Sequence, residues 1–274
     1  MSYKDASSKA ERARKIDFEE YPDWLQRIAG DRIGPRTETY YRAVVNDISR
    51  RFRESEVWRD LSGGLRDLER RYYLETGYDL FSVSEAPELE TKPYGSFLLK
   101  TYRKNVLENP SWPDPPDSGW ILPSLSFEEI NDLVRCRVVV KYLDGVSTVL
   151  DWIGSVCEDY ETRFVADLEA KEEGYYAAHG YVVFPCHIPD REFDTKEIRA
   201  PIEIQVTTQV QDLIYRLLHK YYEERRKTSE HSGICWQWDY ETEEFAANYL
   251  GHILHYVEGM IMDIRRRQED GYAD

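Results

Sequence analysis

Four short stretches of the chain carry the β-branched, aromatic and alternating apolar residues that favour strands. They cover residues 135–143, 162–168, 180–186 and 202–207. Between the first two stretches, Val149, Trp152, Ile153 and Val156 recur at helical spacing. A strand, helix, strand unit of this kind predicts a mixed sheet flanked by helices, which is an α+β fold.

Apolar residues at helical spacing flank this central region. In residues 10–80, for example, Tyr41, Val44, Ile48 and Phe52 lie three or four positions apart. Residues 109–124 contain five prolines and read as a loop. We therefore expect an N-terminal helical region over 1–87, a core over 88–228 and a C-terminal helical extension over 229–274.

Two helices are expected after the last predicted strand. Thr207 or Thr208 can cap the first, whose apolar face includes Leu213, Ile214 and Leu217. The second, over about 242–267, has an apolar stripe that we expect to pack against the rest of the chain. The stripe consists of Phe245, Tyr249, Leu250, Ile253, Leu254, Val257, Met260, Ile261 and Ile264.

The strand at 202–207 has two different faces. Side chains alternate along a strand, so Ile202, Ile204 and Val206 point to one side and form part of the core. The opposite side carries Glu203, Gln205 and Thr207. A buried strand with a carboxylate and an amide along one face predicts a polar floor, which is a place for chemistry.

Composition narrows the function. With 41% hydrophobic residues and 14% aromatic residues the chain is expected to be globular, and the absence of a long apolar run favours a cytoplasmic protein without a membrane partner. The four cysteines, Cys136, Cys157, Cys186 and Cys235, are widely spaced and are expected to be reduced and mostly buried. A net charge of −16 disfavours broad binding to nucleic acid, so a polyanionic ligand would need a local basic patch.

Such a patch occurs in residues 91–107, which include Lys92, Lys100, Arg103 and Lys104 and no acidic residue. Taken alone, such a cluster of positive charges is more often a solvated helix face. The glycine and serine in the patch suit a phosphate-binding loop, but no P-loop motif is present.

Two further positions suggest a nucleotide site. Asp132 is expected to end a short helical segment just before a strand, where a carboxylate suits Mg²⁺. A turn aspartate without a role is the alternative. Tyr175, followed by Tyr176, two alanines and His179, offers an aromatic surface on which a base can stack, although such a tyrosine is more often a core residue.

Taken together, the order and spacing of four segments resemble the synthetase domain of the RelA/SpoT family. They are "KPYGSFLLKTYRK", "INDLVRCRVVV", "GYYAAHGYVV" and "IEIQVTT", followed by His219 sixteen residues after Glu203. The resemblance covers about residues 88–226 and implies a nucleotidyltransferase-like core. It also implies a pyrophosphokinase that moves the β,γ-diphosphate of ATP to the 3′-hydroxyl of GTP or GDP, making (p)ppGpp.

The resemblance also implies roles for individual residues. Asp132 would hold Mg²⁺, and Glu203 would complete the metal site or take the hydroxyl proton. The residues implied along the ATP phosphates are Lys92, Ser96, Lys100, Arg103 and Arg137. Tyr175 would stack on the acceptor base, with support on that side from His179, Gln205 and His219.

The sequence departs from the family pattern at three positions near the implied site. Arg135 replaces a glycine, Thr207 replaces the arginine of E-I-Q-I-R-T, and Leu218 replaces an acidic residue. These changes leave the acceptor open, so a relative that pyrophosphorylates the tRNA 3′ end or makes (p)ppApp is an alternative. A catalytically inactive nucleotide-binding regulator is a second alternative. A homo-oligomer and an antitoxin partner also remain open.

Overall fold

The computed structural model describes residues 14–82, 86–189, 194–227 and 236–271, and in α7 and α8 the side chains only up to residues 218 and 268. By contacts, the chain divides into two compact units. One comprises Met1–Tyr41 and Pro93–Ser126, and the other comprises Arg42–Lys92 and Phe127–Asp274. These units cut across the boundaries expected from the sequence, and the three-part division stays a prediction.

The smaller unit is helical. It contains α1 (Tyr21–Ala29), the first turns of α2 (Pro35–Glu54), α5 (Tyr94–Tyr102) and a π-helical turn, η1 (Arg103–Leu107). Its core is made by Tyr21, Trp24, Leu25, Tyr102 and Val106. The irregular segment that follows η1 agrees with the proline-rich loop predicted over 109–124.

The larger unit contains a mixed sheet, which in the described part of the chain has five strands in the order β1-β2-β5-β4-β3. The strands are β1 (Glu90–Thr91), β2 (Val134–Val140), β3 (Phe164–Ala170), β4 (Tyr176–Pro189) and β5 (Thr195–Thr208). Strands β2 and β5 are parallel, and the other neighbours are antiparallel. Every predicted strand is present, and the α+β fold is confirmed.

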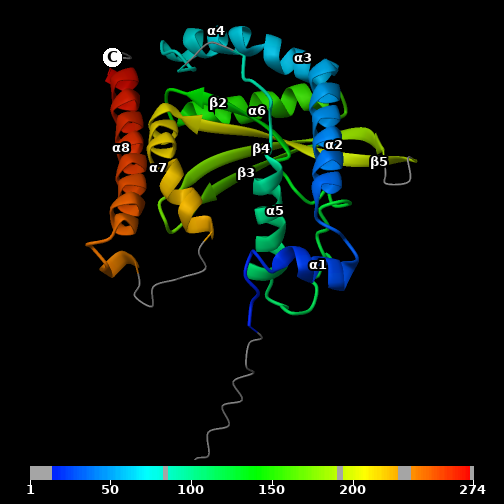
Figure 1. The fold of residues 1–274 in the computed structure, drawn as a ribbon. Helices are drawn as coiled ribbons and strands as arrows, with labels where there is room; N and C mark the ends of the chain where they lie inside the picture. The colour runs from blue at the N-terminus through cyan, green and yellow to red at the C-terminus, as the bar shows by residue number, and fades with distance from the viewer. Residues whose placement is uncertain (1–13, 83–85, 190–193, 228–235, 272–274) are drawn as a thin grey trace, which may run out of the picture. The chain divides into compact units, whose positions relative to one another are not determined.

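Helices of the same unit complete this fold. Besides the rest of α2, they are α3 (Glu56–Gly63), α4 (Leu65–Thr76), α6 (Asp144–Asp159), α7 (Gln209–Lys227), the 3₁₀ turn η2 (Trp236–Trp238) and α8 (Glu243–Gly271). Helix α6 provides the connection between β2 and β3, and its Val149, Leu150 and Ile153 are buried. Helices α7 and α8 run side by side (Figure 1). Thr208 caps α7 as expected, because its hydroxyl accepts a hydrogen bond from the Gln211 amide (3.2 Å).

Two local expectations are wrong. The residues before β2 form bends and turns, so Asp132 does not end a helix. This segment is too short for helix propagation to offset the unfavourable free energy of helix nucleation. The apolar stripe of α8 does not pack inside the chain either: Ile253 is 56% exposed and Ile264 is 54% exposed. An amphipathic pattern shows that a face avoids water, but it does not say which surface covers that face.

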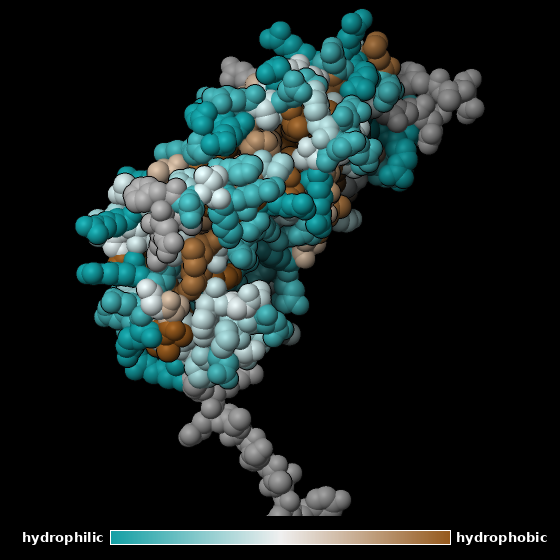
Figure 2. All heavy atoms as spheres, turned by 90° about the vertical axis from the view of Figure 1, so that its right-hand side faces the viewer, coloured by the Kyte–Doolittle hydropathy of each residue, from teal (hydrophilic) through white to brown (hydrophobic). Residues whose placement is uncertain are grey.

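The remaining surface fits the acidic composition. Hydrophilic residues dominate the face turned to the viewer in Figure 2, and apolar residues appear there in small groups. Cys136, Cys157 and Cys186 are buried free thiols, as expected, and Cys235 lies outside the described residues. No helix in the described ranges is long and apolar enough to span a membrane.

Candidate active site

Three strands of the sheet bring their polar residues to one face. The register sets Glu203 of β5 between Arg135 of β2 and Tyr181 of β4. Two residues further along β5, Gln205 lies between Arg137 and His179. Residues paired across neighbouring strands share a face, so the polar floor predicted from β5 alone extends over β2 and β4.

Glu203 is held in this floor from two sides. Its side chain is buried, with only 5% of the residue exposed. One carboxylate oxygen, Oε1, lies 3.0 Å from Nδ1 of His179, and the other, Oε2, accepts a hydrogen bond of 2.9 Å from Nε2 of Gln205. An ionised carboxylate only accepts, so His179 donates from Nδ1. A buried carboxylate needs such donors, and these two fix its orientation.

Arg137 extends the network away from Glu203. Its Nε and Nη2 donate to Oε1 of Gln205 at 3.3 and 3.0 Å, and its Nη1 donates to Oδ1 of Asp212 at 2.9 Å. The guanidinium also lies over the ring of Tyr215, 4.4 Å from its centroid. A continuous set of contacts therefore joins the beginning of α7 to Glu203 across the sheet.

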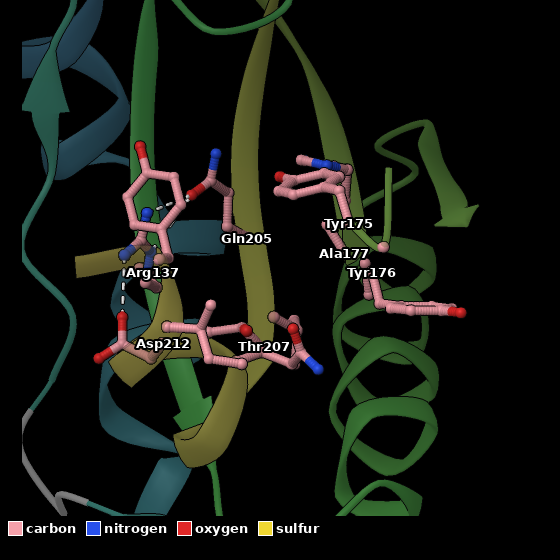
Figure 3. Close-up of a pocket in the computed structure, with 14 residues that line it drawn as sticks. Arg137, Tyr175, Tyr176, Ala177, Gln205, Thr207 and Asp212 are labelled. Atoms are coloured by element: carbon pink, nitrogen blue, oxygen red, sulfur yellow. Dashed lines mark hydrogen bonds and ion pairs between the residues drawn. The ribbon is translucent and has the colours of Figure 1, made fainter. Parts of the chain in front are cut away.

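The network borders a pocket of about 500 Å³, part of which is open to solvent. Figure 3 shows Tyr175 turned towards Gln205, while Tyr176 points away from them. Arg137 and Asp212 form the opposite wall, and Thr207 lies between the walls. The pocket thus has a tyrosine on one side and an arginine stacked on Tyr215 on the other.

The loop before β4 is fixed where it presents Tyr175. The ammonium of Lys171 lies 5.2 Å from the centroid of the Tyr175 ring. Tyr176 points the other way, and its hydroxyl lies 3.0 Å from Nδ1 of His252 in α8. The Tyr176 ring stacks on His255 at 3.7 Å. Tyr175, the predicted stacking residue, therefore lies next to a residue, Tyr176, that anchors the loop to α8.

Burial changes the acid–base behaviour of groups next to Glu203. Burial, and after it the negative charges of Glu203, Glu169 and Asp167, raise the pKa of Tyr181 well above its usual range. The pKa of the Cys136 thiol is also raised, mainly by burial and further by Glu203. Both groups therefore stay protonated at neutral pH.

Asp132 lies at the beginning of β2 and pairs with Lys92, whose Nζ is 2.7 Å from Oδ2 of Asp132. Only 11% of the Lys92 side chain and 15% of the Asp132 side chain are exposed. The backbone also brings them together, because the amide of Lys92 donates to the carbonyl of Leu133 (2.9 Å). Two residues that the sequence predicts separately, one for phosphate and one for metal, are thus neighbours.

The chemistry of Asp132 and Glu203 fits Mg²⁺, which prefers carboxylate oxygens and completes its shell with substrate phosphates and water. A protein site that supplies only two carboxylates agrees with this preference. Among the described residues no group of three or more histidine, cysteine, aspartate or glutamate side chains is placed to hold a metal ion. The metal site at Asp132 and Glu203 stays a prediction.

The other implied ATP contacts are divided between the two compact units. Ser96, Lys100 and Arg103 belong to the smaller compact unit, whereas Lys92 and Arg137 belong to the larger one. Arg103 also forms an ion pair with Glu108. Arg137 lines the same pocket as Tyr175, His179 and Gln205, which the resemblance assigns to the acceptor. The side chain of His219 lies outside the described residues.

Sequence reasoning missed Asp212 and Tyr215 as pocket residues. They lie three positions apart at the beginning of α7, so they share one face of this helix. The polar face of the preceding strand runs directly into that turn, which is the signal that could have indicated them. Position 218, where the family carries an acid, is not among the pocket residues.

Comparison with solved structures gives the fold a name. The small alarmone synthetase 1 from Bacillus subtilis is similar to this chain with a TM-score of 0.51 and 16% identity, over 86% of this chain and 97% of the synthetase. The fold is that of the small alarmone synthetases. A GTP pyrophosphokinase family protein from Streptococcus pneumoniae gives a TM-score of 0.50 and 16% identity, over 92% of this chain and 96% of the other.

A crystal structure of the Bacillus synthetase bound to its product pppGpp is also similar, with a TM-score of 0.50 and 16% identity over 85% of this chain and 96% of that one. At this level of identity the likeness establishes the alarmone synthetase fold alone. No protein family model and no curated protein sequence matches this chain.

Proposed function

We propose that this protein is an ATP-dependent pyrophosphokinase whose acceptor is a guanosine nucleotide, GTP or GDP. The observation that carries the proposal is the position of Glu203. It is buried in the polar floor next to the pocket, and His179 and Gln205 hold both of its oxygens. A fixed carboxylate beside an aromatic-walled pocket is what a general base for a nucleoside hydroxyl requires.

The proposed reaction joins the acceptor 3′-oxygen to the β-phosphorus of ATP. The bond between that phosphorus and the oxygen that bridges to the α-phosphate breaks, and AMP leaves with this oxygen. The proton of the 3′-hydroxyl passes to Glu203. No covalent intermediate with the protein is needed, because phosphoryl-type transfer depends mainly on positioning and on charge neutralisation.

Asp132 would hold Mg²⁺, and Glu203 would be its second carboxylate ligand if Glu203 does not act as the base. When bound, the ion neutralises charge on the transferred phosphates. Lys92 supplies a further positive charge beside Asp132. We propose that Lys92, Ser96, Lys100 and Arg103 contact the ATP phosphates as well, and that Arg137 serves the acceptor pocket that it lines.

The pocket supports an acceptor with a flat base. Tyr175 offers one aromatic face, and Arg137 stacked on Tyr215 forms the facing wall. Base stacking on an aromatic side chain contributes roughly 1–3 kcal/mol per base. His179 and Gln205 then link this base site to Glu203. His219, on the same helix as Tyr215, is proposed to support the acceptor side.

A tRNA 3′ end is the second candidate acceptor. The observation that favours it is Thr207, which lines the pocket where the resembling family carries an arginine. Without that arginine, the pocket lacks a positive charge that could bind the phosphates of a free nucleotide acceptor. An adenosine nucleotide remains the third candidate acceptor.

Transfer of label from ATP to separate acceptors tests the proposal. Purified protein is incubated with Mg²⁺ and ATP labelled at the γ-phosphate, with GTP, GDP, ATP alone or tRNA as acceptor. We expect label in the GTP and GDP products. Label in tRNA alone would replace the proposed acceptor. Binding of nucleotides without transfer to any acceptor would favour the inactive regulator.

A further inference from the structure

Arg135 lies in the polar floor with a carboxylate on each side. The register pairs it with Glu90 of β1 on one side and with Glu203 of β5 on the other. Its side chain is 31% exposed. The resembling family carries a glycine at this position, so the family pattern assigns no role to this positive charge.

Along β2, Arg135 lies between two groups of the candidate site. Asp132, which pairs with Lys92 at 2.7 Å, comes three residues before it, on the side proposed for the ATP phosphates. Arg137, which lines the acceptor pocket (Figure 3), comes two residues after it and shares its face of the sheet. A diphosphate that moves from ATP to the acceptor would pass between these groups, next to Glu203.

The contacts of Arg135 differ from those of Arg137. The guanidinium of Arg137 donates from Nε, Nη1 and Nη2 to Gln205 and Asp212. Nη2 of Arg135 instead lies 3.5 Å from Oε2 of Glu90, whose side chain is 67% exposed. Exposed ion pairs contribute little to stability. Pairing with Glu90 alone therefore does not account for an arginine in the middle of the floor.

The charge of Arg135 matters for a ligand that carries phosphates. Glu90 and Glu203, its neighbours across the sheet, would both repel a diphosphate that lies beside them. A guanidinium has five N–H donors in a planar arrangement that matches phosphate oxygens. Arg135 therefore gives this row of the floor the positive charge and the donors that phosphate binding requires.

We propose that Arg135 binds the β- and γ-phosphates of ATP and stays in contact with this diphosphate while it moves to the acceptor oxygen. Its N–H groups donate to non-bridging phosphate oxygens, and they form no covalent bond. A positive charge fixed at this point stabilises the negative charge of the transferred group throughout the transfer. The inference rests on the proposed function and adds a phosphate-binding residue to its site.

Nucleotide binding without an acceptor tests the inference. The probe is the ATP analogue with a methylene group between the α- and β-phosphates, which cannot be cleaved at that position. AMP, which lacks the two phosphates assigned to Arg135, is the comparison. Isothermal titration calorimetry in Mg²⁺ gives both dissociation constants.

Arg135→Gln should raise the dissociation constant for the analogue about tenfold, as expected for the loss of one hydrogen bond between charged groups. The constant for AMP should not change. Arg135→Lys should recover part of the affinity, because it keeps the charge but not the planar pair of donors.

Lys141→Gln, just after the other end of β2, is the matched control. The Lys141 side chain is also 31% exposed and pairs with an exposed carboxylate, that of Asp79. The substitution removes the same charge from similar surroundings and should leave the affinity for the analogue unchanged. Thermal unfolding should show that both glutamine variants are folded.

Glu90→Gln gives a second, independent test, because it leaves Arg135 in place. It removes a negative charge next to the proposed phosphate position and should lower the dissociation constant for the analogue roughly twofold. Asp79→Asn, which frees Lys141 in the same way, should have no effect.

Three results would overturn the inference. The first is an Arg135→Gln variant that binds the analogue as tightly as the wild type. The second is an equal loss of affinity for the analogue and for AMP, which would show a general disturbance of the nucleotide site. The third is a Glu90→Gln variant that binds the analogue more weakly.

These measurements require no transfer, so they decide the inference separately from the proposed function. A wild-type protein that binds the analogue through Arg135 and transfers phosphate to no acceptor would support the inference and contradict the proposed function. A wild-type protein that transfers the diphosphate equally well with Arg135→Gln would do the opposite.

Discussion

Glu203 and Asp132 carry the negative charge on which the proposed transfer depends. Glu203→Gln and Asp132→Asn keep the size of each side chain and remove that charge. We expect each variant to lose nearly all transfer activity and to remain folded. Glu203→Gln also sets an amide group against the donors of His179 and Gln205, which the carboxylate accepts from.

Steady-state transfer rates check this prediction, with thermal unfolding as the measure of folding. Glu169→Gln on β3 is the control: Glu169 lies 3.9 Å from Nε2 of His179 and is outside the proposed chemistry. A tenfold loss of activity corresponds to an increase of only ~1.4 kcal/mol in the barrier. If a variant kept more than about a tenth of the activity, the residue that it replaces would not be essential.

Tyr175 is predicted to act through its ring. Tyr175→Ala should raise the KM for the acceptor about fivefold or more and change the KM for ATP little, because stacking of roughly 1–3 kcal/mol is lost on one substrate only. Tyr175→Phe keeps the ring and should have a small effect. Tyr73→Ala, at a 52% exposed tyrosine of α4, controls for the loss of a surface ring. Equal damage from Ala and Phe would assign the role to the hydroxyl.

At the scale of elements, α8 supports the loop that carries Tyr175. Gly174 has a φ of +74°, and Gly251 of α8 lies so close that a methyl group on it would overlap the Gly174 backbone oxygen. Gly251→Ala should therefore lower the free energy of unfolding by about 1–3 kcal/mol and raise the acceptor KM.

Gly259→Ala is the matched control on the same helix, since a methyl group there meets nothing within 4 Å. It should stabilise the protein by ~0.5–1 kcal/mol, because alanine favours a helix more than glycine does. Urea unfolding measures both variants. Equal stability of the two would show that the close approach of α8 to the loop is unimportant.

The elements themselves were largely predictable from the sequence. Strands β2 to β5 and helices α6 to α8 follow from local patterns, since alternation and helical spacing act over a few residues. The two faces of β5 were also predicted from the alternation of side chains: Ile202 and Ile204 are buried. Gln205 lies on the opposite, polar face. The exposure of the apolar stripe of α8 could not be predicted from the sequence. The pattern within one helix does not show whether another element packs against its apolar face.

The site was predictable only in part, for a similar reason. The polar face with Glu203 and Gln205 was predicted from the alternation of side chains along the strand, and Tyr175 was singled out from its segment and from the resemblance; the roles of all three stay predictions. The contacts of Arg137 with Gln205 and Asp212 depend on the register of β2 against β5 and on the position of α7, which no local pattern specifies. The pairing of Lys92 with Asp132 likewise depends on where β1 meets β2.

For the whole molecule, the net charge of −16 bears on the acceptor. With a free nucleotide as acceptor, Arg225→Glu combined with Arg226→Glu in α7 should barely alter turnover, and the rate should fall only modestly with salt. With tRNA, the same change should reduce activity sharply, and the rate should fall steeply between low and physiological salt as phosphate contacts are screened. Initial rates over a salt series separate the two outcomes.

The most direct test of the central claim is to identify which bond of ATP is broken in the proposed reaction. Phosphorus NMR can follow a mixture of ATP, GDP, Mg²⁺ and purified protein through the reaction. The account predicts AMP and, in equal amount, a guanosine nucleotide with a diphosphate on its 3′-oxygen. Formation of ADP would indicate transfer of one phosphate, and release of pyrophosphate would indicate nucleotidyl transfer. Either product in place of AMP would contradict the account.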